Sequence, residues 1–144
     1  MAAAFNKFQD FVNQLALTKH NLNTDTWKVA LTNSAPVNTN TVLSNITQIA
    51  NGNGYTTGGA DATRSMAYAT GTVTVSGTKV VWTCATAPMG PFQYAVLYND
   101  TQTSPADPPI GWWDYGSALT LQVGETFSVK FNSSDTTGTI CTFS

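Results

Sequence analysis

The chain has 144 residues, a formal net charge of −2 and only 10% charged residues. Its lysines and arginines are scattered, so the basic cluster that nucleic-acid binding requires is missing, and no apolar run approaches the roughly 18 residues of a membrane span. The sequence near Met1 has no secretion signal, so we expect a protein that stays in the cytoplasm until it assembles, without contact to nucleic acid or membrane.

Uncharged polar residues, above all threonine, asparagine and serine, take the place of the missing charges. Threonine is β-branched and fits a half-solvated strand, so the composition favours a sheet protein. Removing a hydroxyl from water costs much less than removing a charge, and charges are depleted at the centres of protein interfaces. The composition therefore favours a surface that packs against other protein molecules. The alternative is an acidic, threonine-rich surface without such a role.

The first segment, Ala2 to Lys19, is predicted to be a helix. Its apolar residues recur at the spacing of one helical face, at Phe5, Phe8, Val12 and Leu15, with Phe11 beside them. We expect the helix to end at His20 and Asn21, because asparagine commonly terminates helices. Such an aromatic helix would pack on its own sheet or reach into a neighbouring molecule, and the sequence leaves both open.

The next segment alternates between apolar and polar residues from Thr26 to Thr32, which predicts a half-buried strand. A short second helix is expected to begin near Asn40 or Thr41 and to end at Gly52, because Val42, Ile46 and Ile49 have helical spacing. The glycine-rich stretch 51–59 (NGNGYTTGG) lacks the lysine and hydroxyl residue of a phosphate loop. We interpret it as an ordered surface loop with tight turns.

The second half of the chain is predicted to be rich in strands separated by Gly, Pro and Asn turns. Residues 71–76 and 78–84 flank Gly77 and are typical of a hairpin. Residues 92–98 are apolar on both faces, as expected for a central strand. Further strands are expected at 111–116, 118–121, 126–131 and 139–143.

Together these elements predict a mainly β fold, an antiparallel β-sandwich or jelly-roll-like domain with an N-terminal α-helix and one short additional helix. Residues 1–144 are expected to form a single domain, with the helix in 1–20 and the β domain in 26–144. The residues expected in the core between two sheets are Trp27, Val29, Leu31, Trp82, Tyr94, Val96, Phe127 and Val129.

Residues with catalytic or metal-binding potential are few. The single histidine, His20, has no nucleophile motif near it and is expected to be solvated or to cap a helix. Cys84 and Cys141 are too few for a zinc site, so we expect small buried side chains; a disulfide between adjacent strands or between two subunits is the alternative. Asp114 and Glu125 are expected to accept hydrogen bonds from turn amides rather than to catalyse glycoside hydrolysis.

Three blocks stand out in order along the chain: Trp27–Pro36 (WKVALTNSAP), Ile46–Gly59 (ITQIANGNGYTTGG), and Gly90–Asp100 (GPFQYAVLYND) with Ile110–Gly116 (IGWWDYG) and Gly124–Phe127 (GETF). In combination they resemble a family of small structural proteins of tailed bacteriophages. The resemblance extends from Trp27 to about Phe131. The initial helix and the residues after Phe131 are less typical of that family.

The resemblance implies a capsid decoration (cement) protein without enzymatic activity. Such a protein is assembled in the bacterial host cytoplasm, binds the major capsid protein on the outer surface of the virion head, commonly as a homotrimer, and stabilises the head. The alternative is a tail- or fibre-associated module that binds glycans through Trp112, Trp113 and Tyr115, because aromatic rings stack on sugars. We expect no catalytic, cofactor-binding or metal-binding residues. The predicted interaction residues are Phe5, Phe8, Gly52, Gly54, Tyr55, Trp112, Trp113 and Tyr115.

Overall fold

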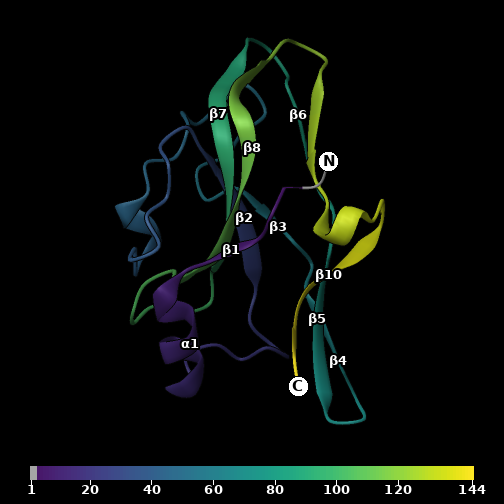
Figure 1. Ribbon diagram of the computed structural model, residues 1–144. Coiled ribbons are helices and arrows are strands. Elements are labelled where there is room, and N and C mark those ends of the chain that lie inside the picture. The colour runs from purple at the N-terminus through teal and green to yellow at the C-terminus, as the bar shows by residue number, and fades with distance from the viewer. Residues whose placement is uncertain (1–2) are drawn as a thin grey trace.

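Antiparallel strands are the main regular elements of the computed structural model, which describes residues 3–144 (Figure 1). The mainly β prediction is confirmed. A five-stranded sheet has the order β1 (Asn6–Lys7), β8 (Pro109–Leu121), β7 (Met89–Asn99), β2 (Trp27–Thr32) and β3 (Ala60–Asp61). A three-stranded sheet has the order β10 (Thr137–Phe143), β5 (Thr72–Thr78) and β4 (Ser65–Ala69), and β6 (Val80–Thr83) pairs with β9 (Thr126–Val129).

The two longest strands, β7 and β8, pair along most of their length. Ala95 lies opposite Trp113 and Val96 opposite Trp112, and the register shifts at several points along the pair. The sequence predicted two separate strands in this part of β8. The structure has one continuous strand instead, because Gly116 adopts a φ of 96° and allows the strand to continue where the side-chain pattern breaks.

The main hydrophobic core contains side chains from all three sheets. Trp27, Val29 and Leu31 of β2 are fully buried in it, and Trp82 and Val129 are largely buried there as well, as predicted. Two of the other predicted core residues are more exposed than expected. Tyr94 is only partly buried, and Phe127 is partly buried but packs against the main core.

Val96 is buried on the opposite face of the five-stranded sheet. It belongs to a separate cluster with Phe8 and Ile46, against which Trp112 packs. Successive side chains of a strand point to opposite faces, so the chain must cover both faces of β7. Ala95 and Leu97 face the main core, whereas Val96 faces this second cluster, formed by segments outside the strands of the smaller sheets.

The N-terminal helix is shorter than the sequence predicted. It spans only Gln9–Ala16 (α1), and the preceding residues form β1 at the edge of β8. The ring of Phe5 occupies the space above Gly111, where an added Cβ would lie 2.2 Å from Phe5 Cε2. The apolar residues before α1 thus pack on the sheet as extended chain, and their helical spacing misled the prediction.

The predicted second helix is a single 3₁₀ turn, Leu43–Asn45. After it the extended chain runs beside β2. Gln48 forms an isolated antiparallel β-bridge with Thr32, and the amide of Ile49 donates to the carbonyl oxygen of Leu31 over 3.0 Å. The apolar residues of this segment point into the sheet from an extended chain, so their spacing did not indicate a helix.

The predicted hairpin around Gly77 is also wrong. Gly77 lies inside β5, and an added Cβ there would lie 2.9 Å from the side chains of both Phe131 and Ile140, so close packing explains this glycine. The turn lies earlier, at Thr70 and Gly71, which have φ values of 47° and 80°. It joins β4 to β5, whereas β6 pairs with β9 in another sheet.

We predict that Val96→Ala lowers the free energy of unfolding by about 1–4 kcal/mol, through lost apolar burial and the cavity left behind. Chemical denaturation would measure the change, and Val123→Ala is the matched control because Val123 is 58% exposed. Equal stability of the two variants would contradict the second hydrophobic cluster.

Candidate functional site

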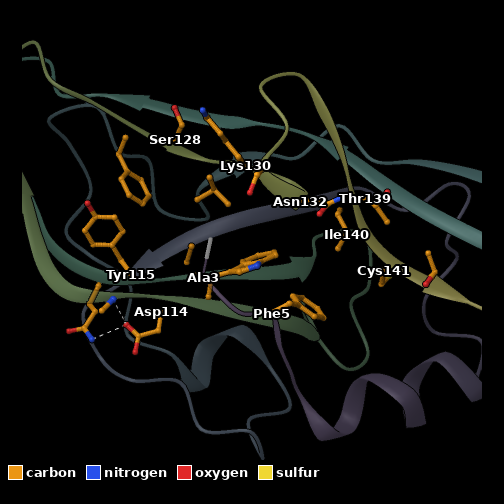
Figure 2. A pocket seen from close by; sticks show the side chains of 18 residues that line it. Ala3, Phe5, Asp114, Tyr115, Ser128, Lys130, Asn132, Thr139, Ile140 and Cys141 are labelled. Atoms are coloured by element: carbon orange, nitrogen blue, oxygen red, sulfur yellow. Dashed lines mark hydrogen bonds between the residues drawn. The ribbon is translucent and has the colours of Figure 1, made fainter. Parts of the chain in front are cut away.

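A groove with a volume of about 1020 Å³ lies between β8 on one side and β9 and β10 on the other (Figure 2). Trp113 and Tyr115 of β8 and Phe127 of β9 supply aromatic rings to its lining. Ile140 and Cys141 of β10 line it as well, and Phe5 lines it beside Ala3. The groove follows the stretch where the edge of β8 away from β7 has no strand partner, among the described residues, beyond the short β1.

The predicted aromatic triplet does not form one surface. The ring of Trp113 packs 5.2 Å from that of Phe5, measured between ring centroids, on the groove side. Tyr115 is 58% exposed and meets Phe127 edge-on at 5.8 Å. Trp112 lies on the other face of β8, in the cluster around Val96. Only Trp113 and Tyr115 are therefore available together to a ligand in the groove.

Polar groups at the groove are partly occupied by contacts within the chain. The carboxylate of Asp114 accepts hydrogen bonds from Gln93 Nε2 at 2.9 Å and from the amide of Gly116 at 2.7 Å (Figure 2). Away from the groove, Glu125 accepts a hydrogen bond of 2.7 Å from the amide of Gln122. Both carboxylates thus accept a hydrogen bond from a backbone amide, but only Glu125 does so at a turn, as expected from the sequence; Asp114 and Gly116 lie inside β8.

The glycine-rich stretch 51–59 contacts its own chain closely. Tyr55 is buried; its hydroxyl donates to Gln48 Oε1 at 2.5 Å and accepts from the amide of Leu31 at 3.2 Å. Burial raises the pKa of Tyr55 to about 12. Gly54 has a φ of 106°, and an added Cβ would lie 2.0 Å from the carbonyl oxygen of Thr83. Gly52, with a φ of 117°, has open space around it.

Two predicted interaction residues are therefore corrected. Phe8 and Tyr55 are buried by contacts within the same chain, so their side chains are not free to meet a partner. Sequence reasoning assigned them to a partner surface because aromatic spacing indicates a need for burial but not which surface provides it.

His20 was expected to be solvated or to cap a helix; it is instead buried and belongs to a polar cluster. The side-chain amide of Asn99 donates to Asp25 Oδ2 at 2.6 Å and to His20 Nδ1 at 3.1 Å. Since Nδ1 accepts, the neutral ring carries its proton on Nε2, which has no hydrogen-bond partner within the described residues. Burial lowers the pKa of His20 to about 4, although Asp25 and Asp10 oppose the shift.

The cysteines are free, as their expected role as small apolar side chains requires. Cys84 is fully buried and its thiol donates to the carbonyl oxygen of Ala87, whereas Cys141 is partly buried beside the groove. Burial raises the pKa of Cys141 to about 11, so its thiol stays protonated at neutral pH. Residues 3–144 hold no group of three or more His, Cys, Asp or Glu side chains that is arranged to bind a metal ion.

The sequence analysis missed a second exposed surface, the hairpin formed by β4 and β5, which we call the hairpin arm (residues 65–78). Every residue of β4 is exposed, Tyr68 by 70% and Met66 by 36%. The arm contains no charged residue, whereas Arg64 and Lys79 flank it directly. Figure 1 shows β4 beside β5, and β5 is bordered on its other edge by β10; the outer edge of β4 has no strand partner in the described part of the chain.

The base of the hairpin arm is held firmly to the rest of the molecule. The guanidinium of Arg64 donates to the carbonyl oxygens of Asp25 and Leu22, and the amide of Thr78 donates to the carbonyl oxygen of Ala62 over 2.7 Å. The sequence signal for the arm is the Thr70–Gly71 turn; the absence of charge in 65–78 is not specific, because residues 29–60 and 80–99 are uncharged as well.

The buried histidine makes stability depend on pH. The folded-state pKa of about 4 lies below the unfolded value near 6.5, so protonation favours the unfolded chain. We predict that stability is constant above about pH 6.5 and falls by about 3 kcal/mol as the pH decreases to about 4. Denaturation curves across this range measure it, with His20→Gln as the comparison. An equally steep acid loss in His20→Gln would assign the effect to other groups.

No helix in residues 3–144 has both the length and the apolar character needed to cross a membrane. Comparisons with models of known protein families, with curated proteins and with solved structures gave no match to this chain. The groove and the hairpin arm are therefore the two surfaces from which a function can be argued.

Proposed function

We propose that this protein is a non-catalytic structural subunit of a bacteriophage particle, a capsid decoration protein that binds the outer surface of the head and stabilises it. The observation that carries the binding role is the hairpin arm, whose outer strand is exposed and whose residues 65–78 are uncharged. The assignment to a phage head draws on the sequence blocks described above, and the arm supports it as a surface suited to binding other proteins.

An exposed strand edge presents unpaired backbone N–H and C=O groups, and proteins commonly protect such edges with charges, proline or bulges. Strand β4 has none of these protections: its sequence is SMAYA and its pairing with β5 is regular. Exposing such an edge risks aggregation unless another protein covers it. A partner could cover this edge without removing any charge from water, so the desolvation cost of the contact is low.

The partner in this proposal is the major capsid protein, with further contacts between copies of the decoration protein. A specific interface typically buries roughly 1,200–2,000 Å² in total, more than one hairpin provides, so the groove face or the loop at Gly52 would contribute as well. Many weak contacts repeated over a shell then add up through multivalency. The trimer implied by the resemblance is one arrangement that mass measurements can test.

A non-catalytic role is supported by the state of the titratable residues. Asp114 and Glu125 bind backbone amides, and His20 is buried with a pKa of about 4, away from the groove lining.

We also propose to describe the fold as an open β-sandwich, with the five-stranded sheet as one layer and the two smaller sheets together as the other. The core residues that these sheets share support this description.

The groove favours a second candidate, a tail-associated module that binds glycans. Trp113 and the exposed ring of Tyr115 lie beside the polar side chains of Gln93 and Asp114, and this combination of flat rings and hydrogen-bonding groups suits a sugar. Trp112 takes no part, because it lies on the other face of β8.

Matched tyrosine variants separate the two candidates. For a decoration protein, we expect Tyr68→Ala to weaken binding to heads that lack the protein, while Tyr115→Ala leaves it unchanged. Binding is measured by co-sedimentation with purified heads, and high salt should scarcely reduce it because the arm carries no charge. Loss of glycan binding on an array with Tyr115→Ala, together with normal head binding of Tyr68→Ala, would favour the tail module.

The position and effect of the protein on the particle test the phage assignment itself. Particles made without it are expected to form heads that lose their DNA at a lower temperature than complete particles. Cryo-EM density is expected on the outer shell. Density confined to the tail, with heads equally heat-resistant in both preparations, would overturn the capsid decoration proposal.

A further inference from the structure

We propose that the free edge of β4 pairs with the same edge of a second copy, so that two hairpin arms form one antiparallel sheet around a two-fold axis at Ala67. The proposal rests on the hairpin arm being a contact surface and names its partner as another copy of this chain.

The turn determines which backbone groups of β4 are free. Thr70 and Gly71 form a two-residue loop with positive φ at both positions, so the flanking residues Ala69 and Thr72 exchange hydrogen bonds within the hairpin. Hydrogen-bonded and non-hydrogen-bonded pairs alternate along an antiparallel ladder. The N–H and C=O groups of Ser65, Ala67 and Ala69 therefore point toward β5, whereas those of Met66 and Tyr68 point outward at the free edge.

This outward pattern is self-complementary. A two-fold axis at Ala67 places Met66 opposite Tyr68 of the second copy and Ala67 opposite its own equivalent. Each Met66–Tyr68 pair then exchanges both of its N–H···O bonds, and the two Ala67 residues form the non-hydrogen-bonded pair between them. Shifting the strands by one residue would set outward groups against groups already used within the hairpin, so the backbone favours this register.

The side chains agree with the same register. Met66 and Tyr68 lie on one face of β4, opposite Val75 and Val73 of β5. Pairing would therefore bring the Met66 thioether beside the Tyr68 ring of the second copy on both sides of the axis, and sulfur–aromatic contacts of this kind are favourable. Ala67, on the other face, is small enough for the close approach of a non-hydrogen-bonded pair.

Charge does not oppose the contact. The paired residues 65–69 are uncharged, and the nearest cation, Arg64, is held by backbone carbonyls at the base of the arm. Each Arg64 would lie beside the uncharged Thr70–Gly71 turn of the other copy. The paired strands are short compared with a standard interface, so the dimer is expected to be weak and to depend on concentration. A two-fold contact at this edge also gives dimers, so a trimer would need a different surface.

A matched pair of lysine variants tests the contact in the full-length protein. Ala67→Lys places like charges directly opposite one another across the axis, and we expect the dissociation constant measured by sedimentation equilibrium to rise about fivefold or more. Thr74→Lys is the control, because Thr74 lies opposite Ala67 within the hairpin but on the central strand β5. Equal weakening by both variants, a chain that is monomeric at all concentrations, or a closed trimer would overturn the proposal.

Cysteine crosslinking tests the register. In a Cys141→Ser background, Ala67→Cys is expected to form an intermolecular disulfide rapidly on mild oxidation, because facing Cα atoms in such a pair lie within disulfide range. Ser65→Cys is the control, since Ser65 would face Ala69 and lie far from its own equivalent. Crosslinking of Ser65→Cys at the same rate would exclude the two-fold axis at Ala67.

The outcomes separate this inference from the proposed function. If Ala67→Lys abolishes dimers but heads still bind the protein on their outer shell, both stand and the dimer contact is not the shell contact. If dimers are absent while head binding depends on Tyr68, the second-copy inference fails and the decoration role remains. If dimers form as described but the protein is not on the head, only the assignment to the capsid fails.

Discussion

The fold depends on covering both faces of β7. Ala95 and Leu97 on one face enter the core shared with the other sheets, while Val96 and Tyr98 on the opposite face are equally buried. A strand with apolar residues on both faces is stable only when two separate covers exclude water from it. The smaller sheets contribute one cover, and the other comes from the segments around Phe8, Leu43 and Ile46.

The need to cover both faces of β7 determines where several other parts of the chain lie. The N-terminal segment runs along the edge of β8, with Phe5 at the groove and Phe8 in the cluster around Val96 on the other face, and α1 follows. The buried cluster of His20, Asp25 and Asn99 then connects the loop after α1 to the end of β7, and Arg64 binds the same loop at the base of the hairpin arm. Within the arm, Val75 of β5 is buried in the main core, whereas β4 is the outer strand of its sheet and all of its residues are exposed.

The two candidate surfaces differ in chemistry for the same structural reason. The groove forms where β8 continues past its short partner β1, so it is lined by aromatic side chains with polar groups beside them. The arm presents an uncharged strand edge: the exposed side chains of Met66 and Tyr68 lie there beside outward N–H and C=O groups that have no partner strand among the described residues. The groove therefore suits a ligand recognised through ring faces and hydrogen bonds, and the arm suits another strand.

The sequence by itself determined the β character of the chain, the strands around residues 27–32, 92–98 and 126–129, and most of the core. Alternation between apolar and polar residues reports directly which side of a strand is buried, and the turn residues mark where strands end. Only the tertiary structure decided that Phe5 and Phe8 extend along the sheet, that Gly77 fits a crowded core, and that Trp112 and Trp113 serve opposite faces. It alone revealed the hairpin arm and the buried setting of His20. Apolar spacing records that a side chain must be removed from water, but the neighbour that removes it comes from elsewhere in the chain.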